Sequence, residues 1–225
     1  SQFWYNWLFR IGSFVTPVFL GMSFGALIGG KIIITEDYEN YGFYDLFMQH
    51  WLNIFSLLVG LFYAALCAFL ASTLLIGEAE GKARKHYARN SAFFTTVLVV
   101  LGFILISFGY FSDIKFAEDF IHNPVSLACV AFSGILLFPL WKFIKKEYRI
   151  ASRYLAVFQV ILVLFAALYA HFPYIIITAN EEVSLLANLA PEATISNLAI
   201  MLLIGGFIIL PGLFHLMCSF NMIKV

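Results

Sequence analysis

The sequence predicts an all-α integral membrane bundle of six transmembrane helices. Of its 225 residues, 62% are hydrophobic and only 12% are charged, whereas a soluble domain is about 45–50% apolar and about 25% charged. The apolar residues also gather in six stretches of about 18 residues or more, the length that spans a bilayer. A soluble enzyme, a disulfide scaffold and a disordered chain therefore fit poorly, and the net charge of zero leaves no electrostatic footprint for nucleic acid.

The six stretches form one membrane domain over 1–225 and cover about 11–32, 52–77, 93–112, 124–141, 151–171 and 196–220. Backbone N–H and C=O groups cannot stay unpaired in hydrocarbon, so only helices or a closed barrel can cross it. Barrel strands alternate lipid-facing and inward-facing residues over about ten positions. The run 57–70 does not alternate, so helices are predicted.

Charge in the connecting segments predicts the orientation of the chain. Grouping alternate loops puts eleven of the thirteen Lys and Arg residues on one side and ten of the thirteen Asp and Glu residues on the other. Basic loops of membrane proteins face the cytoplasm, so both ends of this chain are expected to be cytoplasmic. No ionisable residue falls at mid-membrane, where such residues are usually functional. This argues against a self-contained pump, and less strongly against a facilitator.

Small residues and a proline recur every four positions along the first predicted helix. They are Ser13, Pro17, Gly21, Gly25 and Gly29. This spacing places them on one face, where small side chains let two helix backbones approach closely. We interpret Gly21 and Gly25 as points of helix contact; a ligand touching the backbone is the alternative.

Two later helices begin with similar residues. Asn53 and Asn123, 70 positions apart, each precede an apolar run. Asn is a good N-cap, and Pro124 suits the first helical turn. The match indicates either that two helices are capped in the same way at their starts or that a helix pair has been duplicated within the chain. Pro139 and Pro211 are expected to kink the fourth and sixth helices.

The histidines do not suggest a haem site. They are His50, His86, His122, His171 and His215. His50, His122 and His171 fall at the outer boundary, and no two histidines are expected to face each other at matching depth. A metal site formed by these three, or by His215 with Cys218, is a minor alternative because imidazole suits several transition metals. We therefore predict no catalytic, cofactor-binding or metal-binding residue.

Five stretches in order resemble subunit II of the cytochrome bd-type quinol oxidases. The opening 7–13 is similar to the third helix of that family, and 43–46 with 53–60 to the approach to its next helix. Glu80-Gly81-Lys82-Ala83-Arg84 is similar to its cytoplasmic signature, Phe172-Pro173-Tyr174 to the segment after its penultimate helix, and 198–211 to its last helix. The chain departs from the family pattern in lacking the first two helices, with their acidic residues, and in the run 188–194.

The resemblance implies a function for this chain. Subunit II is a haem-free companion of subunit I, the subunit that binds the haems, oxidises quinol and reduces oxygen in the bacterial cytoplasmic membrane. We therefore expect no haem on this chain, a partner that bears the haems, bound lipid and a quinone held as a structural component. The first two helices of the family are expected either on a separate chain or on a part of the protein that this sequence does not include. Its notable residues are structural: Asn53 and Asn123 as caps, Gly21 and Gly25 as contacts, and Glu80 with Arg84 as an i,i+4 pair. A small-solute transporter of repeated helix pairs is the alternative, because transporters carry broken helices in repeated halves.

Overall fold

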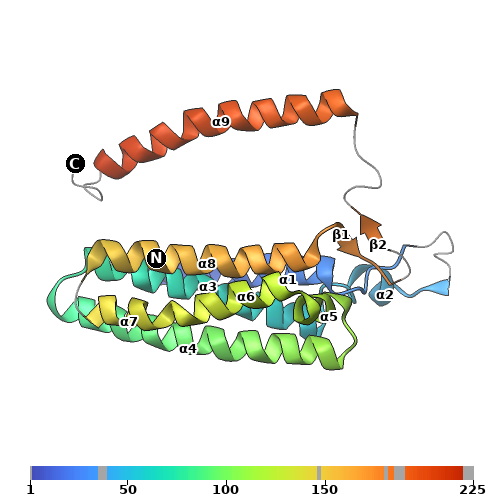
Figure 1. The fold of residues 1–225 in the computed structure, drawn as a ribbon, viewed down its shortest axis with the longest axis horizontal. Coiled ribbons are helices and arrows are strands. Elements are labelled where there is room, and N and C mark those ends of the chain that lie inside the picture. The colour runs from blue at the N-terminus through green and yellow to red at the C-terminus, as the bar shows by residue number, and fades with distance from the viewer. Residues whose placement is uncertain (1, 35–39, 146–147, 180–181, 185–190, 220–225) are drawn as a thin grey trace. The chain divides into compact units, whose positions relative to one another are not determined.

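The computed structural model describes residues 2–34, 40–145, 148–179, 182–184 and 191–219. Helices dominate it (Figure 1). The elements are α1 (Gln2–Ile28), α2 (Phe43–Phe47), α3 (Ile54–Glu78), α4 (Gly81–Phe111), α5 (Lys115–His122), α6 (Pro124–Ile135), α7 (Leu137–Lys145), α8 (Arg149–His171), β1 (Tyr174–Ile177), β2 (Glu182–Ser184) and α9 (Glu192–Ser219). The chain divides into two compact units, 1–184 and 185–225, which are described separately. The single domain over 1–225 stays a prediction.

Six helical segments are long and apolar enough to cross a membrane, which confirms the predicted fold class. They are Trp4–Ile28, Ile54–Gly77, Gly81–Phe111, Pro124–Lys145, Ile150–His171 and Glu192–Gly212. The third segment begins twelve residues before its predicted range of 93–112, because the basic segment before residue 93 is helical from Gly81 onward. Phe220, the predicted end of the last span, and residues 188–190 lie outside the described part of the chain.

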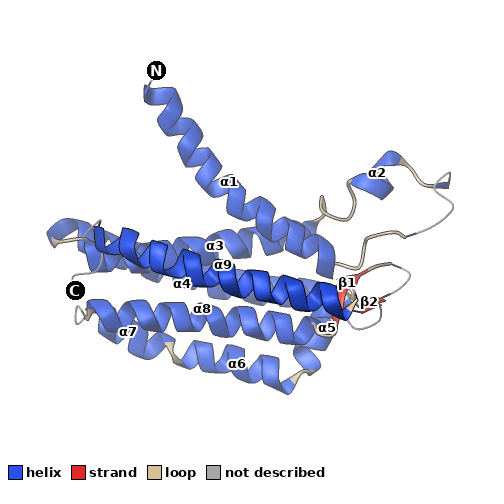
Figure 2. Cartoon of the chain, turned by 90° about the horizontal axis from the view of Figure 1, so that it is seen from above, coloured by secondary structure: helices blue, strands red, loops and turns tan. Residues whose placement is uncertain are grey.

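The first unit is a bundle in which α3 contacts α1, α4 and α8, while α6 and α7 pack along α8. Figure 1 shows α8, α6 and α7 running beside α3 and α4. The N-terminal half of α1 diverges from the other helices of this unit (Figure 2). In agreement, an added Cβ at Gly12 would meet nothing within 4 Å.

Two apolar clusters hold the helices of this unit together. One contains Phe55, Phe116 and Ala166 with their buried neighbours, near the end where α1 ends, α3 begins and α4 ends. We call this the acidic end, after the acidic residues of its loops. The other contains Phe69, Leu140 and Ala156 and lies nearer the opposite or basic end, where α4 begins and α7 ends.

Short elements close the acidic end. β1 and β2 pair antiparallel, with Tyr174 opposite Ser184 and Ile177 opposite Glu182. The segment that follows α1 is hydrogen-bonded to the residues that follow β1, because the Ala179 N–H donates to the Ile32 carbonyl at 2.9 Å. The short link between α3 and α4 lies at the basic end, where Gly81 has φ +56°, a conformation that glycine adopts without steric cost.

The predicted kink in the fourth span is a break between α6 and α7 at Leu136, three residues before Pro139. A proline removes the bond to the carbonyl four residues earlier and its ring presses on that carbonyl, which here belongs to Ile135. The second unit contains α9, with Pro211 inside it.

Candidate functional site

Glycines make a close contact between α1 and α3. An added Cβ at Gly21 would lie 2.7 Å from Tyr63 Cβ and 2.8 Å from Gly60 Cα, and one at Gly25 would lie 2.7 Å from Ser56 Cα. A Cβ at Gly60, on α3, would lie 2.6 Å from the Val18 carbonyl oxygen. The α1–α3 contact is therefore backbone against backbone, and it includes Gly60, which the sequence analysis did not single out.

Both predicted asparagines stand at helix starts. Asn53 Oδ1 accepts a hydrogen bond from the Ser56 N–H at 2.9 Å, and its Nδ2 donates to the carbonyls of Gln49 and His50 at 3.0 Å each. Asn123 Oδ1 accepts from the Val125 N–H at 3.0 Å and from the Ser126 N–H at 3.4 Å. Each cap satisfies N–H groups that a helix leaves without an internal partner.

Buried hydroxyls join α3 to α4. Thr73 Oγ1 and Ser91 Oγ lie 2.7 Å apart, and both residues are fully buried. Thr73 also donates to the Phe69 carbonyl at 2.9 Å, and Thr95 donates to the Ser91 carbonyl at 2.7 Å. Thr73 and Thr95 lie in apolar runs and Ser91 ends the basic segment before residue 93, so only helical periodicity could have placed all three on the contact face.

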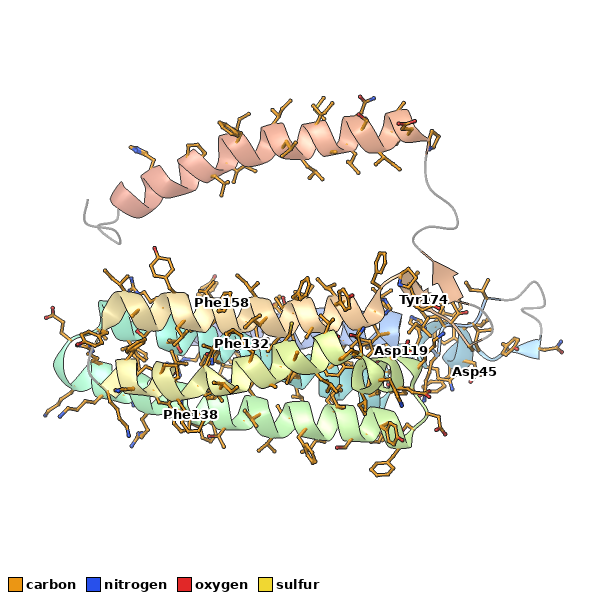
Figure 3. The ribbon with its side chains drawn as sticks, in the orientation of Figure 1. Asp45, Asp119, Phe132, Phe138, Phe158 and Tyr174 are labelled. Carbon is orange, nitrogen blue, oxygen red and sulfur yellow. The ribbon has the colours of Figure 1, made fainter. Side chains whose placement is uncertain are left out.

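A second polar pair joins α6 to α8. Ser126 Oγ donates to the Ala166 carbonyl at 2.9 Å. Gln159 Nε2 donates to the Ser133 carbonyl at 3.0 Å, in the last turn of α6 before its break. Phe132 and Phe158 meet edge to face between the same helices, with ring centroids 6.5 Å apart (Figure 3). An inter-helix bond thus supports the backbone where the helix is interrupted.

Arginines cover the helix ends at the basic end. Arg153 Nη2, from α8, donates to the Leu74 carbonyl at 3.2 Å, and its guanidinium fills the space that a side chain at Gly77 would need. Both positions are near the C-terminus of α3, where the helix dipole favours a cation. Arg84 is 9% exposed. Glu80 precedes α4 at its N-cap, and the predicted Glu80–Arg84 pair stays a prediction.

An open cavity of about 770 Å³ lies at the acidic end, between the end of α1, the α4–α5 turn and β1. Its charged lining residues are Lys31, Asp113 and Lys115. Lys115 Nζ lies 4.6 Å from the centre of the Tyr174 ring, a cation–π distance. Two cations and one carboxylate make a mixed lining that gives no clear preference for the charge of a ligand.

The histidines occupy separate positions. His171 is 7% exposed and packs edge to face against Phe24 and Phe116. His122 Nδ1 donates to the Glu118 carbonyl at 2.9 Å within its own helix. His215 lies in the second unit, and the side chain of Cys218, its alternative co-ligand, is outside the described part of the structure.

Metal-ligating side chains do not gather in the described ranges. Within residues 2–34, 40–145, 148–179, 182–184 and 191–219, no group of three or more His, Cys, Asp or Glu side chains is placed to hold a metal ion. The polar side chains found at the helix contacts are hydroxyls, a carboxamide and guanidinium groups. These polar contacts position the helices relative to one another.

The family comparison decides between the functional hypotheses. A family model for cytochrome bd terminal oxidase subunit II matches residues 1–220. The chain belongs to the cytochrome bd oxidase subunit II family. No curated protein matches the sequence. Membership confirms the predicted family and favours the oxidase subunit over the transporter.

Membership of this family implies an oxidase complex with other subunits. The chain is a multi-pass membrane protein of such a complex. Several of its buried polar side chains make contacts between its own helices, while large apolar side chains are exposed on the membrane-length helices of the first unit. Such an outer surface suits lipid or neighbouring membrane subunits.

Proposed function

We propose that this chain is the haem-free half of a cytochrome bd-type quinol oxidase and supports the assembly and stability of the haem-bearing subunit I. In this proposal subunit I binds the haems, oxidises quinol and reduces oxygen to water, while this chain supplies packing surface. The proposal rests above all on the match of the family model for cytochrome bd terminal oxidase subunit II to residues 1–220. The close contact between α1 and α3 through Gly21, Gly25 and Gly60 supports a packing role, because it joins two membrane-length helices backbone against backbone.

The positions of the imidazoles support the haem-free assignment. A haem iron held by two histidines needs them on opposite faces of one pocket at the depth of the macrocycle. His171 is packed between aromatic rings, while His86 Nε2 lies 3.2 Å from Asn90 Nδ2 near the start of α4. These two side chains stand at opposite ends of the bundle, so they do not form such a pair.

We also propose the bacterial cytoplasmic membrane as the location, with the basic end and both chain ends on the cytoplasmic side. The exposed cations Lys82, Lys85 and Arg89 at the start of α4 support this orientation, because cytoplasmic loops carry an excess of Lys and Arg. A quinone held between apolar helix faces remains part of the proposal as a structural component.

A deletion strain tests the assembly role. Membranes lacking this chain are examined for the haem absorbance of the oxidase, for the amount of subunit I and for quinol-dependent oxygen uptake. We expect all three to fall together and to return on re-expression of the chain. A normal haem spectrum with uptake abolished would show instead that the chain takes part in turnover. Haem bound to the chain when it is isolated from subunit I would contradict the haem-free assignment.

A further inference from the structure

Exposed cations form one line along the start of α4. Lys82, Lys85 and Arg89 are all exposed, and spacings of three and four residues put them on the same face of the helix. The buried face carries Ser91 and Thr95, which lie about half a turn away around the helix axis. The cations therefore point away from the contact with α3.

The same outward face continues as an apolar strip. Phe93, Val100 and Phe103 are 62%, 51% and 76% exposed, and each falls within a narrow sector around the direction of Arg89 at about 100° per residue. The outward face of α4 is thus cationic over its first turns and apolar along the rest of its length. Long basic side chains can lie along such a surface and still place their charge at the level of the lipid headgroups.

The end of α7 repeats this order of residues. Lys142 and Lys145 are exposed in its last turn, and Phe138, one turn deeper, is 79% exposed. Phe138 lies on the part of α7 that runs beside α4 (Figure 3), and the two helices are in contact. Trp141 is 41% exposed next to Lys142, and tryptophan is enriched at the membrane–water interface.

We propose that the cationic ends of α4 and α7 bind the phosphate of an anionic phospholipid, with its acyl chains lying along the apolar strips that contain Phe93 and Phe138. Charge complementarity selects this ligand. Neither α4 nor α7 contains an Asp or Glu residue in its sequence. The acidic Glu80 is exposed at the N-cap of α4, and it stands against five exposed cations on the two neighbouring helices. A positive-inside bias alone requires cations near this end, but it does not require them to align with the apolar strip on both helices.

The binding site is defined by depth and charge, so it does not depend on which side of the membrane the basic end faces or on the assembly role proposed above. A basic pocket between transmembrane helices at headgroup level is a recurrent way to bind acidic lipid. Phosphatidylglycerol, with one net negative charge, is the simplest probe, and zwitterionic phosphatidylcholine is the matched comparison.

Native mass spectrometry of the purified oxidase complex tests the site by titration with each lipid. The Lys85→Gln/Lys142→Gln variant is compared with Lys31→Gln/Lys115→Gln, which removes the same charge at the acidic end. Each cation near an anionic lipid surface contributes roughly fivefold in affinity, so removing two of them should weaken phosphatidylglycerol binding by roughly thirtyfold in the first variant. Binding by the second variant should match the unsubstituted complex, and phosphatidylcholine binding should not change. Equal weakening in both variants, or no weakening in the first, would overturn the proposal.

A second measurement uses the unsubstituted complex, so its result does not depend on whether a variant folds. Photoactivatable phosphatidylglycerol is cross-linked to the unsubstituted complex, and the adducts are located by peptide mass spectrometry. Adducts on 82–93 and 138–145 support the site. Adducts confined to other helices or to another subunit of the complex would refute it.

Discussion

The α1–α3 contact makes a sharp prediction for Gly25→Ala. The new Cβ would lie 2.7 Å from Ser56 Cα, whereas ordinary van der Waals contacts of a Cβ begin at 3.4 Å. The two backbones would therefore have to separate by about 0.7 Å or more, because Cα atoms cannot rotate away as a flexible side chain could. Overpacking of this kind costs typically about 1–3 kcal/mol, and alanine at this site should destabilise the subunit accordingly.

The matched control lies on the same helix. Gly12→Ala adds the same methyl group where nothing lies within 4 Å, and replacing glycine by alanine inside a helix gains roughly 0.5–1 kcal/mol of helix stability. Thermal denaturation of the purified complex, followed by size-exclusion chromatography of the intact particle, measures both variants. We expect Gly12→Ala to be at least as stable as the unsubstituted protein and Gly25→Ala to be less stable. If the two variants denature at the same temperature, the close approach of α1 and α3 is refuted.

Further predictions concern the polar contacts. Asn123→Ala should destabilise the subunit by about 1 kcal/mol, with most of the loss recovered by Asn123→Asp, because either side chain can accept from the first-turn N–H groups; the same thermal assay measures both. Gln159→Leu leaves the Ser133 carbonyl without its side-chain donor, a loss of about 1–3 kcal/mol, but it also removes the buried Gln159 Oε1, which has no hydrogen-bond partner among the described residues, so we expect a net loss at the lower end of that range; a leucine variant more stable than the unsubstituted chain would contradict the bond. A double-mutant cycle on Thr73 and Ser91, each changed to Ala, should give a coupling of about 0.6 kcal/mol, the average found for such bonds within membranes; a coupling near zero would show that the two hydroxyls do not interact.

The number and type of the membrane helices could be read from the sequence because the bilayer imposes a length. An apolar run that spans the hydrocarbon must be helical when it cannot close into a barrel, so the six runs were sufficient. Hydropathy locates the apolar part of a helix and not its ends. The basic segment before residue 93 was therefore predicted as a loop, although α4 begins at Gly81. The cations of this segment therefore lie on the helix itself, before its apolar run begins.

The contacts between helices were less accessible to sequence reasoning. The glycine pattern of α1 indicated a contact face, since small residues at every fourth position lie on one side of a helix. It could not identify α3 as the neighbour or show that Gly60 faces Gly21. Likewise, Gln159 is one polar residue in an apolar run, and the sequence alone does not show that it contacts Ser133, which is 26 residues away.

The related starts of α3 and α6 show how far a short sequence match can be interpreted. Asn53 and Asn123 both accept from the N–H of a serine three residues later, and both serines are fully buried. The hydroxyls then diverge, because Ser56 Oγ donates to the His50 carbonyl at 3.3 Å before its own helix, whereas Ser126 Oγ donates across to Ala166 on α8. Cap chemistry alone thus accounts for the shared asparagine, since an N-cap needs a short side-chain acceptor. The two serines make different contacts, so a shared packing partner does not explain why both helices have serine at this position. The serine is therefore the part of the sequence match that still favours duplication of a helix pair.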